Sequence, residues 1–588
     1  MRNTISLFMW GYQPYFRLSM ERRSREVLGL VGPVLDAPLE PKALLAGVRT
    51  PEESHGHPVC VEPEQGEWKP AIFFGCAERA ESIYTTHPGH SILYGDEPRM
   101  RDKPENIRRD SVRQAVREVT EAYDSSHGTL SFCGMATRVG GYHVAPILQF
   151  DRHQVVEYPQ LPEPIRYGEY SAPAGLFEST IECLLREASS ALAGREPGRF
   201  FDVMRGDANG ILREAGDHFC SAITLATGDL TFQGVFETLN NISSLPYEGV
   251  GAIGELLFTP VSCRDVDVRV RLRTPVSLHN YRLARKMIET TGRNLSCVCT
   301  GASGISGLGV LQNKTADGVI RVRFSGHYNW DMYYKNVAVM QSAFGVPRLP
   351  RVKIKEAAFR TAVRRLFREI QEEAELRLWR IVEAVMKQRH GTIIVVSAAA
   401  EKEADRLKKQ SIATERVSLT PDLVGQLTNI DGAILLDTNV VCHAIGVILD
   451  GMATEEGDPS RGARYNSALR YISSQPKSST LCLVVSDDGY VNMLPPFRAQ
   501  IRRSAVRKYI NLLRTQDTDD CWESINWLDE HRFYLNAEEC RVVNREVSRI
   551  YDAPLEVGEI RLEIPEFLPH PDMNDTYYVE EAEGEGIR

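Results

Sequence analysis

The sequence predicts a multidomain protein in which an α/β domain near the C-terminus follows an α+β N-terminal region. Its 588 residues exceed the length over which one hydrophobic core keeps growing, so several domains of roughly 100–200 residues each are expected. The content of 43% hydrophobic and 25% charged residues is that of an ordinary globular protein. Over residues 391–495, apolar runs of strand length alternate with helical patterns, which is typical of a mixed sheet flanked by helices.

Shifts in composition and pattern divide the chain further. The stretch 158–175 carries four prolines and reads as a linker. The expected segments are an N-terminal α+β region at 1–170, a second α+β region at 171–345, a connecting amphipathic helix at 346–390, the α/β domain at 391–500, and a helical extension with an acidic, disordered tail at 501–588.

In the first half, residues 1–70 read as irregular because Pro, Gly and Glu are frequent there. A helix is expected over 106–124 from apolar residues spaced three and four apart, and strands are expected at 129–135 and 142–150. The second region predicts helices at 176–192 and 282–291 and strands at 266–273 and 294–300. Cys297 and Cys299 lie two apart on the last of these strands, so both face one side and read as core residues.

The glycine-rich stretch GASGISGLG, at 301–309, invites comparison with phosphate-binding loops. It lacks the GxxxxGK[ST] pattern, and no helix follows a GxGxxG spacing, so a turn within a β-hairpin is the favoured interpretation. Further on, residues 353–388 carry a continuous apolar stripe without Pro or Gly. They predict one helix about 50 Å long at ~1.5 Å per residue, which would join the N-terminal regions to the α/β domain or meet a partner chain.

Charge and composition exclude several functions as the default. The net charge of −10 gives no indication of a nucleic-acid surface, and a basic helix face at residues 502–508 reads as solvated or as a partner contact. No apolar run reaches the ~18–20 residues that a membrane span needs, and no secretory signal is recognised, so we expect a cytoplasmic protein that does not bind membranes. The pairs His55/His57 and His87/His90 have spacings that could bind a metal, but loop histidines are the favoured interpretation.

Four features within about 100 residues carry the functional signal. They are GTIIVV at 391–396, DGAILL at 431–436, RGARYNSA at 461–468 and VVSDDGYV at 484–491. Asp-Gly alone is a common turn signal, and an arginine in a helix's first turn is common on surfaces. A carboxylate at the start of a strand can also bind Mg²⁺ or Mn²⁺, and the N–H groups at the start of a helix can face phosphate oxygens. Asp431 and Arg464 are therefore the candidate catalytic residues, with Asp431 as the metal ligand.

In order and spacing these features resemble the diadenylate cyclase (DAC) domain, the nucleotide-binding module of the DNA-integrity scanning protein. The resemblance covers about 391–495, and it implies that an Asp-Gly-Ala motif holds metal and ribose and that a helix N-terminus grips the triphosphate. It also implies a homo-oligomer, because each domain supplies half of the reaction geometry. The residues it assigns to ATP binding are Gly391, Gly432, Ala433, Gly462, Ala463, Arg464, Tyr465, Asn466, Ser486 and Asp488.

Three departures from the family pattern leave two functions open. The family's Gly-Thr-Arg-His-Arg is replaced here by a segment in which Ala463 precedes Arg464, Tyr465 and Asn466, so an imidazole and one fixed positive charge are missing. Losing a cationic group from a phosphoryl-transfer site lowers the rate on the order of 10³-fold. The first hypothesis is a cyclase that condenses two ATP molecules into c-di-AMP and two pyrophosphates under a sensor-like N-terminal region. The second is a binding module that senses ATP or a cyclic dinucleotide without turning it over.

Overall fold

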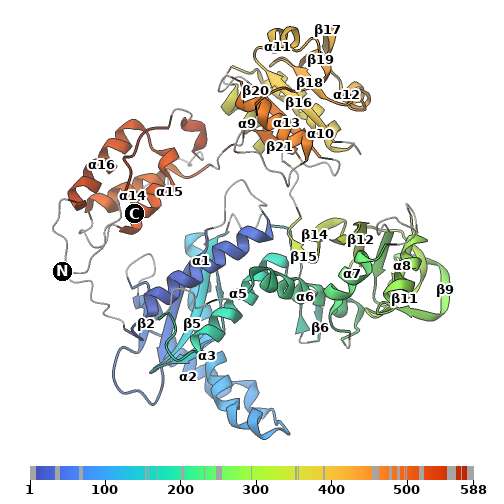
Figure 1. The fold of residues 1–588 in the computed structure, drawn as a ribbon. Helices are drawn as coiled ribbons and strands as arrows, with labels where there is room; N and C mark the ends of the chain where they lie inside the picture. Colours follow the sequence, from blue (N-terminus) through green and yellow to red (C-terminus); the bar gives the residue numbers. More distant parts are fainter. Residues whose placement is uncertain are drawn as a thin grey trace. The chain divides into compact units, whose positions relative to one another are not determined.

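The structure is a computed structural model of the whole chain, and it divides into two compact units, residues 2–351 and 352–588. It describes residues 8–32, 40–64, 70–152, 158–163, 165–168, 170–199, 206–230, 232–246, 254–292, 295–350, 356–367, 369–388, 391–452, 462–475, 480–486, 491–495, 500–515, 522–551, 564–570 and 573–578, with single residues 155, 204, 354 and 497. Figure 1 labels the helices and strands of both units.

The first unit begins with a five-stranded antiparallel sheet covered on both faces. Its strands are β1 (Lys42–Arg49), β2 (Val59–Glu62), β3 (Thr129–Cys133), β4 (Thr137–Val139) and β5 (Tyr142–Asp151), in the order β2-β1-β5-β3 with β4 also paired to β5. Along β1, alternate residues belong to two different apolar clusters: Leu45 packs with α1 (Gln13–Val31) and α5 (Leu176–Leu192), whereas Leu44 packs with α2 (Cys76–Thr86) and α3 (Glu97–His127).

The expectation that residues 1–70 are irregular was wrong. Helix α1 occupies 19 of them, and Pro14 lies in its first turn, where the missing N–H has no intrahelical acceptor to lose. Strand β1 is buried on both faces, so its sequence lacks the polar alternation by which a strand is recognised. The helix expected over 106–124 extends to 97–127, with Pro104 inside it. The strands expected at 129–135 and 142–150 are confirmed.

An eight-stranded sheet completes the first unit. Its order is β15-β14-β13-β12-β8-β10-β11-β9, and only β8 and β10 run parallel. The strands are β8 (Gly254–Phe258), β9 (Val266–Ser277), β10 (Ser296–Cys299), β11 (Gly304–Leu311), β12 (Ile320–Gly326), β13 (Asn329–Tyr334), β14 (Val337–Ala343) and β15 (Val346–Arg348). Helices α6 (Ala208–Thr227), α7 (Val235–Ser244) and α8 (Tyr281–Glu289) pack on it, and a short hairpin, β6 (Arg166–Tyr167) and β7 (Tyr170–Ser171), touches α6.

The glycine-rich stretch lies in a hairpin, as expected, but most of it is strand rather than turn. β10 and β11 pair antiparallel, and the glycines at 304, 307 and 309 are strand residues that face β9. A Cβ on Gly307 would lie 2.3 Å from the carbonyl oxygen of Val270, so glycine is required by the close approach of β9. Both Cys297 and Cys299 are fully buried, which confirms them as core residues.

In the second unit, the predicted continuous helix over 353–388 was also wrong. Two helices, α9 (Glu356–Leu366) and α10 (Glu372–Met386), are separated by a turn and pack on each other. The buried carboxylate of Glu375 explains the break, because Arg360 Nε and Arg364 Nε of α9 lie 3.1 and 2.6 Å from its oxygens. Both helices bury their apolar stripes in one cluster with the six-stranded sheet, so the segment is part of this domain's core.

The six-stranded sheet is mixed, as predicted, and has the order β17-β19-β18-β16-β20-β21. Its strands are β16 (Thr392–Ser397), β17 (Ile412–Ser418), β18 (Ala433–Leu436), β19 (Val441–Val447), β20 (Thr480–Val485) and β21 (Val491–Leu494), and its further helices are α11 (Ala400–Arg406), α12 (Pro421–Leu427) and α13 (Ala463–Ser473). β16 and β18 are parallel and every other pair is antiparallel.

The C-terminal extension is helical, as expected. α14 (Arg503–Thr515), α15 (Trp522–Glu530) and α16 (Ala537–Tyr551) enclose their own apolar cluster. On the predicted basic face, Arg503 Nη1 lies 3.1 Å from Asp575 Oδ1 and its guanidinium lies over the ring of Tyr578. Of the predicted acidic tail, residues 579–588 lie outside those the structure describes. Among the described helices, none has the length and apolar content needed to cross a bilayer.

Candidate functional site

Strand register brings several predicted residues to one edge of the six-stranded sheet. Ile393 of β16 pairs with Ala433 of β18, so Gly391 and Asp431, each two residues earlier, lie at the same level on adjacent parallel strands. Thr392 pairs with Val485 on the other side, so Ser486 leaves the sheet at this edge as well. We call this the Asp431 edge. It consists of the starts of β16 and β18 and the end of β20.

The Asp431 carboxylate is presented to solvent at this edge. Asp431 is exposed, and among the described residues no hydrogen bond or ion pair engages its side chain. Gly432, which follows it, has φ +114°, and a Cβ there would lie 2.5 Å from the carbonyl carbon of Gly446 in β19. Ala433 is fully buried and pairs with Val447. The Asp-Gly-Ala sequence therefore anchors the strand through its last residue, turns the chain at its glycine and leaves the first side chain free.

Helix α13 supplies the other predicted binding residues. Gly462 is its N-cap, with φ −59° and ψ 164°, and as a glycine it has no side chain that could cap the first N–H groups. Ala463 and Arg464 are exposed, whereas Tyr465 and Asn466 are half-buried. Tyr465 packs against the apolar cluster of β16, β18 and β20, and α13 contacts β16, β20 and β21. The N-terminal turn of α13 is therefore part of a helix that packs on β16 and β20, two of the strands that form the Asp431 edge.

Three family models match separate parts of the chain. Residues 380–494 match the family described as DisA bacterial checkpoint controller nucleotide-binding, abbreviated DAC. Residues 9–220 match the probable sensor domain DACNG, and residues 233–336 match the probable sensor domain DACNH. The chain carries a DAC domain behind two probable sensor domains.

Other comparisons add little. No curated protein matches the chain. Among solved structures, a hypothetical membrane-spanning protein from Bacillus cereus is 23% identical over 21% of this chain and 59% of its own, with a TM-score of 0.17. The matched part of the chain thus spans 59% of that protein's length.

Among the described residues, Asp431 is the predicted metal ligand at the Asp431 edge. Within the described part of the chain, no three His, Cys, Asp or Glu side chains cluster in a way that would hold a metal ion. Asp488, the other predicted acidic residue, lies outside the described residues. One exposed carboxylate fits Mg²⁺ or Mn²⁺ when the nucleotide phosphates and water provide the remaining ligands, which is the usual way that proteins bind Mg²⁺. The residues present therefore fit a metal that arrives with its nucleotide.

A polar network that the sequence did not reveal fixes α13 to α11. Tyr471 Oη donates to Glu403 Oε2 at 2.8 Å, and Gln475 Nε2 donates to the same oxygen at 3.3 Å. Arg406 bonds both Glu403 and Asp450, which links this network to the chain after β19. Burial raises the pKa of Glu403, but the hydrogen bonds from Arg406 and Tyr471 outweigh it, so the pKa lies below its ordinary value. The network positions the helix that carries Arg464.

Sequence alone could not single out this network. Glu403 lies in the polar stretch EKEADRLKKQ, which has the composition of any solvated helix. Tyr471 is eight residues past the start of α13, and only the fold shows that it is fully buried. The spacing of Glu403 and Tyr471 along the chain carries no signal, because their contact depends on the packing of two elements.

Of the two histidine pairs, His87 and His90 are hydrogen-bonded within the protein. His87 Nε2 lies 3.0 Å from Asp110 Oδ2, and its Nδ1 accepts from Gly89 N at 3.0 Å, so the side chain caps a turn. His90 Nε2 lies 2.7 Å from the carbonyl oxygen of Tyr84. These rings are engaged with the protein and do not converge on a common point.

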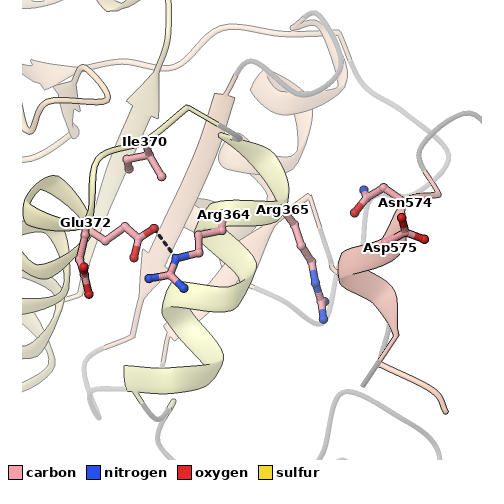
Figure 2. A pocket seen from close by; sticks show the side chains of 7 residues that line it. Arg364, Arg365, Ile370, Glu372, Asn574 and Asp575 are labelled. Atoms are coloured by element: carbon pink, nitrogen blue, oxygen red, sulfur yellow. Dashed lines mark hydrogen bonds and ion pairs between the residues drawn. The ribbon is translucent and has the colours of Figure 1, made fainter. Parts of the chain in front are cut away.

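A cavity of about 560 Å³ lies elsewhere in the second unit. Figure 2 shows Arg364 and Arg365 of α9 on one side and Asn574 and Asp575 on the other, and none of the residues that line the cavity belongs to the predicted site. Arg364 is bound to Glu375, and the Arg365 guanidinium lies 4.6 Å from the ring centroid of Tyr577. Charges of both signs line the cavity, so it indicates no particular ligand.

Proposed function

We propose that the DAC domain binds ATP and joins two ATP molecules into c-di-AMP and two pyrophosphates, under the control of the two sensor domains. The observation that supports this most is the exposed carboxylate of Asp431, which has no partner among the described residues and lies on the sheet edge that also carries Gly391 and Ser486. A protein carboxylate without a protein partner is available to a ligand, and in this family the Asp-Gly-Ala motif faces metal and ribose.

The reaction requires two active sites that face each other. The 3′-hydroxyl oxygen of each ATP forms a bond to the α-phosphorus of the other, the bond from that phosphorus to the pyrophosphate oxygen breaks, and the hydroxyl proton is lost. Two such displacements give the cyclic product, so we propose a homo-oligomer with facing DAC domains. A bound Mg²⁺ or Mn²⁺ would supply charge neutralisation at the phosphates and lower the pKa of the attacking hydroxyl.

The chain's own residues have separate roles in this proposal. Asp431 would hold the metal beside the ribose. Arg464 and the first N–H groups of α13 would bind the phosphates, because a guanidinium and a helix N-terminus both stabilise negative charge. The half-buried ring of Tyr465 would support the base or a phosphate oxygen from the same helix turn.

A second function is favoured by one specific observation. Ala463, Tyr465 and Asn466 replace the family's threonine, histidine and second arginine, so only Arg464 remains as a fixed cation in the motif. Binding tolerates such a loss better than catalysis does, because catalysis depends on stabilising the charge that develops in the transition state. The alternative is therefore a domain that senses ATP or a cyclic dinucleotide without converting it.

Labelled ATP separates the two functions. Purified full-length protein is incubated with the nucleotide and Mg²⁺ or Mn²⁺, and the products are resolved by chromatography. A c-di-AMP peak that is absent with Asp431→Asn but present with Asp437→Asn supports the cyclase. ATP that remains intact although it binds with a dependence on Arg464 supports the sensor. A c-di-AMP peak of equal size with Asp431→Asn would contradict the role of the Asp431 edge.

A further inference from the structure

The matches to the two probable sensor domains meet at one helix, α6. The DACNG match ends at residue 220, inside α6, and the DACNH match begins at residue 233, two residues before α7. α6 lies between α5 and α7 (Figure 1). It packs on α1 and α5, which cover the five-stranded sheet, and on α7, β8 and β15 of the second sheet. The helix therefore belongs to the packing of both domains.

One turn of α6 contacts both domains at once. On the DACNG side, Ser179 Oγ of α5 donates to the carbonyl oxygen of Ala215 at 2.7 Å. On the other side, a Cβ on the next residue, Gly216, would lie 2.9 Å from Pro347 Cγ of β15 and 3.1 Å from Phe236 Cε2 of α7. Glycine at residue 216 thus lets β15 and α7 approach the helix so closely that a methyl group would not fit without displacing them.

One apolar core runs through this junction. A single cluster of buried side chains includes Phe16 of α1 and Leu176 of α5 together with Trp330 and Met332 of β13. The ring centroid of Phe236 lies 5.6 Å from that of Trp330, so α7 continues the core from α6 into the eight-stranded sheet. Domains that move independently usually share a small and more polar interface. A shared core opposes such movement, because separating its halves would expose buried apolar surface to water.

A second connection lies where the chain leaves the sensor domains. The N–H of Leu349 donates to the carbonyl oxygen of Val31, the last residue of α1, at 2.9 Å, and both residues are buried in the shared core. We call this contact the exit clasp. Helix α9, which begins at Glu356, already packs in the core of the DAC domain. The exit clasp therefore joins the first helix of DACNG to the segment that leads directly into the DAC domain.

We propose that DACNG and DACNH act as one sensing body and not as two independent sensors. α6 couples the two domains, and the exit clasp passes the state of the whole body to the DAC domain. A ligand that stabilises either domain then changes the other as well, because the coupling free energy between two sites is reciprocal. The proposal holds whether the DAC domain makes c-di-AMP or only binds a nucleotide, since its test reads the sensor domains directly.

Hydrogen exchange of the full-length protein, followed by mass spectrometry, tests the coupling with matched substitutions. Val144→Ala lies in β5 of DACNG and Val322→Ala in β12 of DACNH, and both valines are fully buried members of the shared core. Deleting buried methyl groups destabilises the cooperative unit that contains them, and the slowest amides exchange when that whole unit opens. We expect each variant to raise the exchange rate of the slowest amides at least tenfold in both α5 and β13.

The control for these two variants is Val395→Ala, which removes the same atoms from a fully buried valine of β16 in the DAC domain. It should speed exchange in the DAC strands and leave α5 and β13 unchanged. The proposal is overturned if Val144→Ala speeds exchange in α5 but not in β13 while Val322→Ala does the reverse, because the two domains would then open independently. Denaturant midpoints establish that every variant is folded.

A second pair of variants tests the route through α6 to the exit clasp. Gly216→Ala adds a methyl group that would displace Pro347, which precedes Leu349 by two residues, so we expect at least tenfold faster exchange in the peptide that contains the Leu349 amide. The matched control is Gly210→Ala in the same helix, where the nearest atom lies 3.6 Å from the new Cβ, and it should leave that exchange unchanged. Unchanged exchange at the exit clasp in folded Gly216→Ala protein would overturn the proposed role of α6.

Discussion

Two carboxylates flank β18, and the DAC domain uses them in opposite ways. Asp437, which follows the strand, accepts hydrogen bonds from the N–H groups of Asn439 and Val441 at 2.8 and 3.0 Å, and His443 Nε2 lies 3.1 Å from its other oxygen. Asp431, which precedes the strand, is exposed and has no partner among the described residues. The first carboxylate closes the hairpin, whereas the second is left available for a ligand.

The largest expected effect comes from substituting each of these two carboxylates in turn. Asp431→Asn should lower product formation on the order of 10³-fold, because it removes the proposed metal ligand, and should change the free energy of unfolding by less than about 0.5 kcal/mol. Asp437→Asn should do the reverse. It should lower the free energy of unfolding by about 1 kcal/mol, since the N–H groups of Asn439 and Val441 exchange a charged acceptor for a neutral one, and should keep product formation per folded molecule. Chromatographic assay and urea unfolding measure the two effects.

The next effect concerns how the Asp431 side chain is kept exposed. Gly432→Ala should destabilise the protein by roughly 1–3 kcal/mol, because φ is +114° and the new Cβ would meet the backbone of Gly446. Gly462→Ala is the matched control, since its φ is −59° and nothing lies within 4 Å of the new Cβ. Equal stability of the two variants in urea unfolding would show that the turn after Asp431 is not constrained by β19.

A smaller effect is expected at the start of α13. Arg464→Ala should weaken ATP binding roughly tenfold to a hundredfold, which corresponds to about 1.5–3 kcal/mol for a charged hydrogen bond to phosphate. Arg470 is an exposed arginine on the same helix whose Nε donates to Asn466 O, so Arg470→Ala should leave ATP binding within about twofold. Calorimetric titration compares the two variants, and an unchanged affinity in Arg464→Ala would place the phosphates elsewhere.

The smallest effect is the pH dependence of the network that holds α13. The pKa of Glu403 is lowered in the folded chain by Arg406 and Tyr471 against the effect of burial, and the bond from Arg406 lowers that of Asp450. Both carboxyls therefore take up protons more readily in the unfolded chain. Their contribution to stability is complete above their ordinary pKa values, 3.8 for Asp450 and 4.5 for Glu403, and is lost as the pH falls through their folded values. Glu403→Gln should flatten the fall of the urea midpoint below pH 4.5, and an unchanged slope would contradict the network's role.

Much of the DAC domain could be predicted because its signals are local. The strands at 433–436 and 441–447 and the helix at 463–473 show their apolar patterns within a few residues, and the four motifs occur in one order. The register of β16 with β18 and with β20 then places Gly391, Asp431 and Ser486 at the same edge of the sheet, whatever their side chains are.

Other features could not be predicted because distant residues decide them. Residues 353–388 contain no Pro or Gly that would mark a break, and the turn between α9 and α10 becomes visible only once Glu375 is seen buried between two arginines of α9. The glycines of 304–309 resemble a loop in sequence, yet they are strand residues because β9 approaches them closely. The predicted domain boundaries stay a prediction.

The measurement that tests the central claim most directly is a calorimetric titration of ATP, with and without Mg²⁺, into the wild-type protein, Asp431→Asn and Asp437→Asn. If the Asp431 edge holds the metal and nucleotide, Mg²⁺ should strengthen ATP binding in the wild-type protein and in Asp437→Asn but not in Asp431→Asn. An equal gain from Mg²⁺ in all three proteins would contradict the account, because the metal would then be held without the carboxylate of Asp431.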